Sequence, residues 1–561
     1  MFRRKAAVAL LAYSLLLPNF AALGQQPTPT PQPTPTPAAP AAPSNDPVER
    51  IKEEGLKRSQ VMETLSHLTE VIGPRLTGSP ALKRANEWTR DRLTSWGLQN
   101  ARLEPWGPFG RGWTLRRFSA EVTEPTPFPL LAYPKAWSPG TDGPVTADVV
   151  LVEASTEAEL QKYKGRLKGA IVLAGQVRET KARFDPIATR LTDKELLDLA
   201  NAPDPALTPR RQRPQPSAEE VARARFNNRK TQFYYEEGAA ALVDSSRGGD
   251  GGSLQFVQQA SVPLPFEPPA DAPRSPWLRN APRILPQITL SNDHYNRVAR
   301  MIQKGQRVRM TLNLAVEFQD EDMMAYNTVA EIPGTDLKDE VVMLGAHLDS
   351  WHTATGATDN AAGVAVMMEA VRILQALNLR PRRTVRIALW TGEEQGLLGS
   401  RAYVREHFGP VPAPSPAAGQ PAPAPVYRPA HEKFYAYYNM DSGTGKIRGI
   451  YLQGNEALRP IFRRWLAPLR ELGADTITLA NAGGSDFLAF DAAGLPGLDF
   501  LQDEIEYGPR TWHSNQDTLD RIIADDVKQA AVVVAAFVYN SAVSDERLPR
   551  KPPRPAATPA R

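Results

Sequence analysis

Two short, mainly apolar runs, each ending in ionisable residues, constrain the fold of this 561-residue chain more than any other feature. Residues 341–346 form a run with no polar break, which stops at His347-Leu348-Asp349. Residues 384–390 form a second run, which is followed by Gly392-Glu393-Glu394. Runs of this length are typical of strands buried inside a sheet.

A helix is expected between these two strands, from 359–363 to about residue 377, and another after the second strand. The Asp-Asn pair at its start can cap the first turn, because both side chains carry oxygen acceptors. The order strand, helix, strand, helix predicts a parallel sheet, whose ligand crevice lies at the carboxyl ends of the strands. We therefore expect four side chains at one rim of the sheet: His347, Asp349, Glu393 and Glu394.

The later part of the chain continues this pattern. A strand at 434–439 leads into Asp441, and a second strand at 498–501 precedes the loop that contains His513. A strongly apolar helix is expected at 524–540. The predicted fold class is α/β, with a mostly parallel mixed sheet flanked by helices and an inserted β-rich domain.

The predicted insertion covers residues 128–314, where short β-type runs alternate with turn signals. No regular structure is predicted for 178–225 within it, because this segment is rich in proline and arginine. Residues 48–127 are predicted to contribute helices to the domain completed by residues 315–544.

The two ends of the chain have different compositions from the rest. A basic start, an apolar core at 6–17 and small residues near Gly24 predict a cleaved signal peptide at 1–24, with an uncleaved anchor as the alternative. We expect no stable membrane span after cleavage. Residues 25–47 are predicted to be a proline-rich linker and 545–561 a disordered tail.

Composition excludes several kinds of function. The chain has no cysteine, which rules out disulfides, thiolate zinc sites and a cysteine nucleophile. The formal net charge is +4, and removal of the three basic residues of the leader leaves +1. No basic tract interleaved with aromatic residues is present, so nucleic-acid binding is not expected.

Five side chains are candidate metal ligands: His347, Asp359, Glu394, Asp441 and His513. Nitrogen and carboxylate ligands without thiolate suit zinc, with manganese or cobalt as alternatives. Five ligands are too many for one tetrahedral ion that keeps an open position. A bridging Asp359 would divide them between two zinc ions, which can share and acidify a water.

Two further acidic residues are assigned catalytic roles. Neighbours at a strand end cannot point the same way, so Glu393 is left to act as general base while Glu394 binds metal. Asp349, two residues after His347, lies on the same side of an extended chain. We expect it to accept a hydrogen bond from the ring nitrogen of His347 that does not bind metal.

Five motifs, in this order, resemble the co-catalytic zinc exopeptidases, the family of bacterial leucyl aminopeptidases and plasma glutamate carboxypeptidase. They are His-x-Asp at 347–349, Thr-Asp-Asn-Ala-Ala-Gly at 358–363, Gly-Glu-Glu-Gln-Gly-Leu-x-Gly-Ser at 392–400, Asn-Met-Asp-Ser at 439–442 and Trp-His-Ser-x-x-Asp-Thr at 512–518. The order of β-type runs in 128–314 resembles the protease-associated domain, an accessory module of several peptidase families.

The resemblance implies a secreted or periplasmic enzyme that releases terminal residues from peptides or dipeptides. It assigns the same ligand roles to the five residues above. A homodimer is compatible with the sequence. One departure concerns the oxyanion: some relatives have tyrosine before the last histidine, whereas this chain has Trp512. The sequence leaves open whether Trp512 or Tyr507 takes that role.

Two other functions are weighed against the exopeptidase. Single-zinc relatives on this scaffold cyclise amino-terminal glutamine, but the presence of all five ligand positions disfavours that reaction. A non-catalytic peptidase-like binding protein would be expected to have lost ligands, and this chain keeps them.

Overall fold

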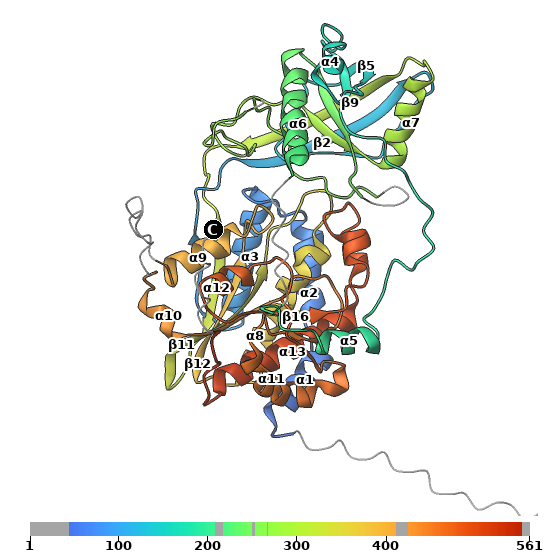
Figure 1. Ribbon diagram of the computed structural model, residues 1–561. Coiled ribbons are helices and arrows are strands. Elements are labelled where there is room, and N and C mark those ends of the chain that lie inside the picture. The colour runs from blue at the N-terminus through green and yellow to red at the C-terminus, as the bar shows by residue number, and fades with distance from the viewer. Residues whose placement is uncertain (1–43, 208–216, 249–252, 266, 411–424, 552–561) are drawn as a thin grey trace, which may run out of the picture. The chain divides into compact units, whose positions relative to one another are not determined.

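Two eight-stranded sheets organise the part of the chain that the computed structural model describes, which is residues 44–207, 217–248, 253–265, 267–410 and 425–551 (Figure 1). The predicted signal peptide at 1–24 and nearly all of the predicted linker at 25–47 lie outside these ranges. No helix within them combines the length and the apolar character that a membrane crossing requires.

The first sheet has parallel strands at its centre. Its strands, in spatial order, are β1 (Gln99–Pro105), β10 (Tyr326–Ile332), β12 (Arg383–Trp390), β11 (Leu337–His347), β13 (Phe434–Asn439), β16 (Gly497–Gln502), β14 (Ile447–Tyr451) and β15 (Thr476–Thr478). β12, β11, β13 and β16 are mutually parallel, while β10 and β14 join them antiparallel. The predicted α/β class, with a mostly parallel mixed sheet, is confirmed.

Helices cover both faces of this sheet (Figure 1). They and the single turns are α1 (Pro47–Lys57), α2 (Val61–Ser66), η1 (His67–Ile72), α3 (Pro80–Ser95), η2 (Ala357–Ala361), α8 (Ala362–Ala376), α9 (Leu398–His407), α10 (Pro429–Lys433), η3 (Glu456–Leu458), α11 (Arg459–Leu466), η4 (Ala467–Leu472), α12 (Phe487–Ala492), η5 (Tyr507–Thr511), η6 (Leu519–Arg521) and α13 (Ala524–Val543).

Alternation along β11 explains why helices are needed on both sides. Val342 and Leu344 face a core built with α1, α2, α8 and α13, whereas Met343 faces a second core built with α9 and α12. Successive side chains of a strand point to opposite faces of the sheet. An apolar run with no polar break therefore needs helices packed on both faces.

Gly55 shows how closely the helices approach. This residue lies inside α1, which packs against α13 and α8. A Cβ atom built there would lie 2.5 Å from Val532 Cγ2 and 2.9 Å from Ile373 Cδ1. Glycine is therefore the residue that lets these helices pack at this distance, which outweighs its low helix propensity.

The second sheet is formed by the inserted region and its flanks. In spatial order it contains β3 (Phe128–Pro129), β2 (Gly112–Glu124), β9 (Arg309–Gln319), β5 (Val145–Leu151), β6 (Ile171–Leu173), β7 (Ala241–Ser245), β8 (Gln287–Leu290) and β4 (Ala132–Pro134). Its helices are α4 (Glu157–Gln161), α6 (Ala218–Glu236) and α7 (Asn292–Gln303), and α5 (Asp193–Ala200) instead contacts β15 of the first sheet.

The boundaries of the second sheet differ from the predicted 128 and 314. β2 and β9 pair antiparallel from Gly112 with Gln319 to Glu124 with Arg309, so both strands belong wholly to this sheet. Residues 48–127 therefore contribute helices and β1 to the first domain, and β2 to the second. Pairing between strands about 200 residues apart carries no local signal, which explains the error.

Parts of two segments expected to lack structure form regular or packed structure among the described residues, which leave out 208–216. The segment 178–225 contains α5 and the start of α6, and both helices begin with a capping box, Thr192 with Glu195 and Ser217 with Glu220. At the carboxyl end, residues 545–551 pack on the first domain: Leu548 is buried, and Arg550 donates to the carbonyl oxygen of His431 at 2.6 Å. Residues 552–561 lie outside the described residues.

The burial of α13 gives a prediction for stability. Phe537 is fully buried against Phe462 and Phe500, so Phe537→Ala leaves a cavity and should cost about 3–5 kcal/mol of unfolding free energy. Phe184, which is 94% exposed, is the matched control, and Phe184→Ala should change the value by less than about 0.5 kcal/mol. Urea denaturation measures both; equal effects of the two substitutions would contradict the assigned core.

Candidate metal centre

The five predicted ligands come from five places at the carboxyl edge of the first sheet. His347 is the last residue of β11, and Asp441 lies two residues beyond the end of β13. Glu394 lies in the turn after β12, Asp359 in η2 and His513 in the loop after η5. Because β11, β12 and β13 are adjacent and parallel, their ends bring these residues together.

The side chains form two groups that share Asp359. Nε2 of His347 lies 3.2 Å from Oδ1 of Asp359 and 3.1 Å from Oδ1 of Asp441. Nε2 of His513 lies 3.4 Å from Oδ2 of Asp359 and 2.9 Å from Oε2 of Glu394. Within each group the potential ligand atoms all lie within 4.8 Å of one another. The two oxygens of Asp359 thus point to different groups.

Buried oxygens without partners show that this geometry fits cations. Oδ2 of Asp359 and Oε1 of Glu394 are buried and form no hydrogen bond with the described residues. A buried carboxylate oxygen without a donor is costly, whereas coordination to a cation satisfies it. The donor set of imidazole nitrogen and carboxylate oxygen suits zinc.

The electrostatics of the cluster leave its histidines protonated when no cation balances the acids. Burial alone would lower the pKa of His513, but the Glu394 carboxylate outweighs it and raises the pKa to about 9. Burial alone would also lower the pKa of His347, but the charge of Asp441 outweighs burial and raises this pKa well above the ordinary value. Burial raises the pKa of Glu394 to about 7. A cation entering the site must therefore displace protons.

Glu393 lies beside the two groups without joining either. Burial raises its pKa well above the ordinary carboxyl value; His347 opposes this change, whereas the charges of Asp441 and Glu394 add to it. Its backbone N–H donates to Oδ1 of Asp349 at 3.3 Å, which fixes the turn. The carboxyl group is thus close enough to feel the charges of the cluster, and its raised pKa favours proton uptake.

Asp349 is placed differently from the expectation. The nearest hydrogen-bond partner of His347 Nδ1 is the backbone oxygen of Asp349 at 3.0 Å, and the Asp349 carboxylate lies farther away, at 3.7 Å. The carboxylate instead accepts from the backbone N–H groups of Glu393 and Glu394, both at 3.3 Å, and from the Thr77 hydroxyl at 2.8 Å. Asp349 therefore orients the two glutamates through their backbone.

Asp517 supports the shared ligand. Its carboxylate accepts from the backbone N–H of Thr358 at 2.6 Å and of Asp359 at 3.1 Å. The expected helix cap is Asn360, whose side-chain oxygen accepts from Gly363 N–H at 3.0 Å. The peptide between Asp359 and Asn360 is cis. Because Asn360 caps the helix, the carboxylate of Asp359 is available to the cluster.

Arg75 is a structural residue that sequence reasoning missed. It is fully buried, and its guanidinium donates to backbone oxygens on both sides of the ligand loop, including Leu348 at 2.7 Å, Thr355 at 2.7 Å and Gly356 at 2.9 Å. The motif Gly-Pro-Arg-Leu-Thr-Gly at 73–78 looks like an ordinary loop. Only the tertiary structure shows that Arg75 and Thr77 tie it to the metal centre.

Tyr507, rather than Trp512, reaches the cluster. Burial alone would raise the pKa of Asp359. Interactions with nearby side chains outweigh burial and lower this pKa; His347 contributes most, and Tyr507 also contributes. Trp512 is 38% exposed and packs against Phe256 and His513. Of the two residues the sequence left open, Tyr507 is therefore the one that acts on the pKa of a candidate ligand.

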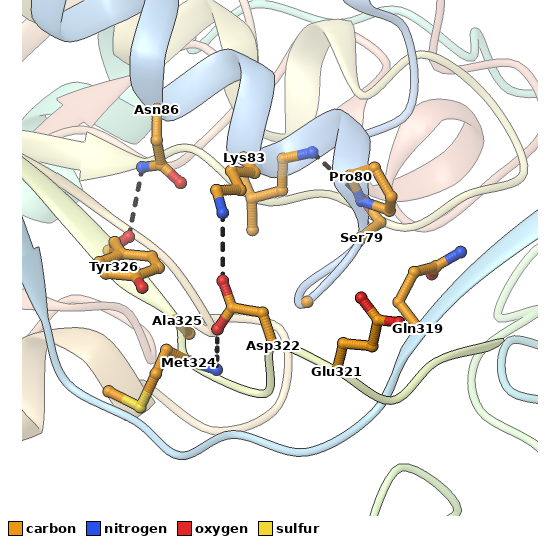
Figure 2. A pocket seen from close by; sticks show the side chains of 12 residues that line it. Ser79, Pro80, Lys83, Asn86, Gln319, Glu321, Asp322, Met324, Ala325 and Tyr326 are labelled. Carbon is orange, nitrogen blue, oxygen red and sulfur yellow. Dashed lines mark hydrogen bonds and ion pairs between the residues drawn. The ribbon is translucent and has the colours of Figure 1, made fainter.

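A pocket outside the centre contains none of these residues. Figure 2 shows it between the start of α3 and the segment 319–326, with a cavity volume of about 210 Å³. Lys83 and Asp322 form an ion pair across it at 3.1 Å, and both side chains are about half exposed. The pair joins α3 to the connection between the two sheets and has no relation to the ligands.

Comparisons with known proteins cover the region that contains the candidate ligands. Residues 327–538 match the model of peptidase family M28, and the matched range contains all five candidate ligands. Carboxypeptidase Q of Mus musculus is 27% identical over 500 residues, which cover 88% of each chain.

Two solved structures share the fold. A peptidase M28 precursor from Shewanella amazonensis SB2B is 25% identical, with a TM-score of 0.61 over 90% of this chain and 98% of its own. A zinc aminopeptidase from Bacillus subtilis is 19% identical, with a TM-score of 0.51 over 87% of this chain and 95% of its own, and this likeness concerns the fold alone.

The support of Asp359 by Asp517 can be tested. Asp517→Asn replaces one acceptor by an amide N–H₂, which leaves one of the two backbone N–H groups unpaired and should cost about 1–3 kcal/mol of unfolding free energy. The matched control is Asp520→Asn, since Asp520 is exposed and should tolerate the change. Chemical denaturation of both variants gives the comparison. A variant of Asp517 as stable as the control would contradict this role.

The protonated histidines predict a pH dependence of zinc binding. Below its pKa of about 9, His513 must lose a proton before it can bind, so affinity should rise with pH. If one proton is displaced, affinity should rise about tenfold per pH unit between about pH 6 and about pH 8. Competition with a chromophoric chelator measures affinity, and calorimetry in two buffers counts the released protons. A constant affinity over this range would disprove the assignment.

Proposed function

We propose that this chain, whose residues 327–538 match peptidase family M28, is a secreted di-zinc exopeptidase that removes terminal residues from peptides or dipeptides. The observation that carries the proposal is the pair of ligand groups that share Asp359. A site in which one carboxylate serves both groups is built for two ions rather than one.

The ligand roles follow from these groups. His347 and Asp441 would hold one zinc ion, Glu394 and His513 would hold the other, and Asp359 would bridge them. Such a pair of ions polarises a substrate carbonyl and acidifies a water.

The protein's own residues handle the protons. Glu393 is held beside the cluster, and no hydrogen bond or ion pair of its carboxylate is found among the described residues. Its raised pKa favours taking a proton from the attacking water and giving it to the leaving amine. The hydroxyl of Tyr507, a residue that helps to lower the pKa of Asp359, is the donor we assign to the developing oxyanion.

The proposals for location and domain identity rest on sequence. The basic and apolar start of the chain supports export through a cleaved signal peptide. The parallel strands β5 to β8, inserted before the catalytic half, support a protease-associated domain. The presence of both ligand groups disfavours a single-zinc glutaminyl cyclase and a non-catalytic binding protein.

A substitution at Glu393 tests the mechanism. Glu393→Gln keeps the size of the side chain but removes the base, so hydrolysis should fall by at least about a hundredfold while both ions stay bound. Glu406→Gln, at an exposed position on α9, is the control and should retain activity. The assay is a panel of aminoacyl and dipeptide substrates, free or blocked at either end. Full activity of the Glu393 variant would remove this residue as the base.

A further inference from the structure

A segment of the inserted region pairs with the loop that carries the last ligand. The backbone N–H of Phe256 donates to the carbonyl oxygen of His513 at 2.8 Å, and Gln255 forms an antiparallel bridge with Ser514. Leu254 N–H donates to the side-chain oxygen of Asn515 at 2.7 Å, and Asn515 N–H donates back to Leu254 at 3.1 Å. The second domain is thus in direct backbone contact with the metal centre.

The same segment is fixed firmly within its own domain. The backbone N–H of Gln255 donates to the Ser246 hydroxyl at 2.9 Å. Ala136 N–H donates to the carbonyl oxygen of Gln258 at 3.0 Å, and Ala260 N–H donates to the carbonyl oxygen of Ala136 at 2.8 Å. The backbone around Gln258 is therefore held within the inserted domain.

The Gln258 side chain contacts the outer nitrogen of His513. Its amide nitrogen lies 3.3 Å from Nδ1 of His513, while Nε2 of the same ring faces Glu394 and Asp359. The ring's aromatic neighbours, Phe256, Trp351 and Trp512, offer no lone pair to a donor. Among the described residues, Gln258 is the group positioned to hydrogen-bond this nitrogen.

Metal binding at His513 decides whether the oxygen or the nitrogen of the Gln258 amide should face Nδ1. When Nε2 gives its lone pair to a cation, the neutral ring carries its hydrogen on Nδ1, and that N–H requires an acceptor. A half-turn of the glutamine amide exchanges its two ends, which have nearly the same size, and presents the oxygen to Nδ1. Without an acceptor, the competing tautomer puts the hydrogen on Nε2, where the cation must bind.

We propose that Gln258 is the positioning residue of His513: its amide oxygen accepts from Nδ1–H and thereby fixes the metal-binding tautomer. This inference rests on the proposed di-zinc function. The two histidines then differ in the origin of their support, since His347 is oriented by the backbone of Asp349 in its own strand end. The ligand group that contains His513 therefore depends on the inserted domain, whereas the group that contains His347 does not.

The test compares acceptors at position 258. Gln258→Leu removes the acceptor but keeps a side chain of similar size. The affinity for the zinc ion at His513 should fall by about 10- to 100-fold, while the ion at His347 should bind as in the wild type. Gln258→Glu keeps an acceptor and should bind both ions at least as tightly as the wild type. Gln259→Leu is the matched control, because the Gln259 side chain is exposed.

The readout is zinc binding by the metal-stripped full chain, measured by competition with a chromophoric chelator, with metal content after dialysis as a second measure. Thermal unfolding of each variant checks the fold. Three results would overturn the inference: unchanged binding by Gln258→Leu, equal weakening of both ions, or a Glu variant as weak as the Leu variant. A wild-type chain that binds one ion would instead reject the proposed function, so the two failures are distinct.

Discussion

The structure depends on one electrostatic constraint, which is that three carboxylates and two imidazoles are buried together at the ends of three parallel strands. Asp359, Glu394 and Asp441 are too close to remain charged without compensating cations. In the absence of metal, the protonated histidines supply that compensation, as the raised pKa values of His347 and His513 indicate. A pair of divalent cations would satisfy the oxygens of Asp359 and Glu394 that lack partners.

The surrounding protein holds the backbone that presents these groups. Asp517 fixes the turn at Asp359, Asp349 fixes the turn at Glu393 and Glu394, and Arg75 bridges carbonyl groups on either side of the ligand loop. All three are buried charged residues, and each forms hydrogen bonds with backbone groups at or next to a ligand. Hydrogen bonds from these three residues explain how the acidic side chains at the edge of the sheet keep one geometry although they repel one another.

Local patterns were sufficient to predict the central strands and the ionisable residues that follow them, because both are properties of short segments. The strand predicted at 434–439 is observed as Phe434–Asn439, and the residues that follow each central strand lie where parallel pairing puts them. The roles of Asp517, Arg75 and Gln258 could not be predicted, since each depends on segments more than 150 residues away. The capping boxes of α5 and α6 were readable in the sequence, but the proline-rich composition around them outweighed that signal.

The central claim is that two cations share Asp359. The most direct measurement is anomalous diffraction at the zinc absorption edge from crystals of the zinc-loaded chain. The account predicts two peaks that share Asp359, one beside His347 and Asp441 and the other beside Glu394 and His513. A single peak, or peaks away from these residues, would contradict it.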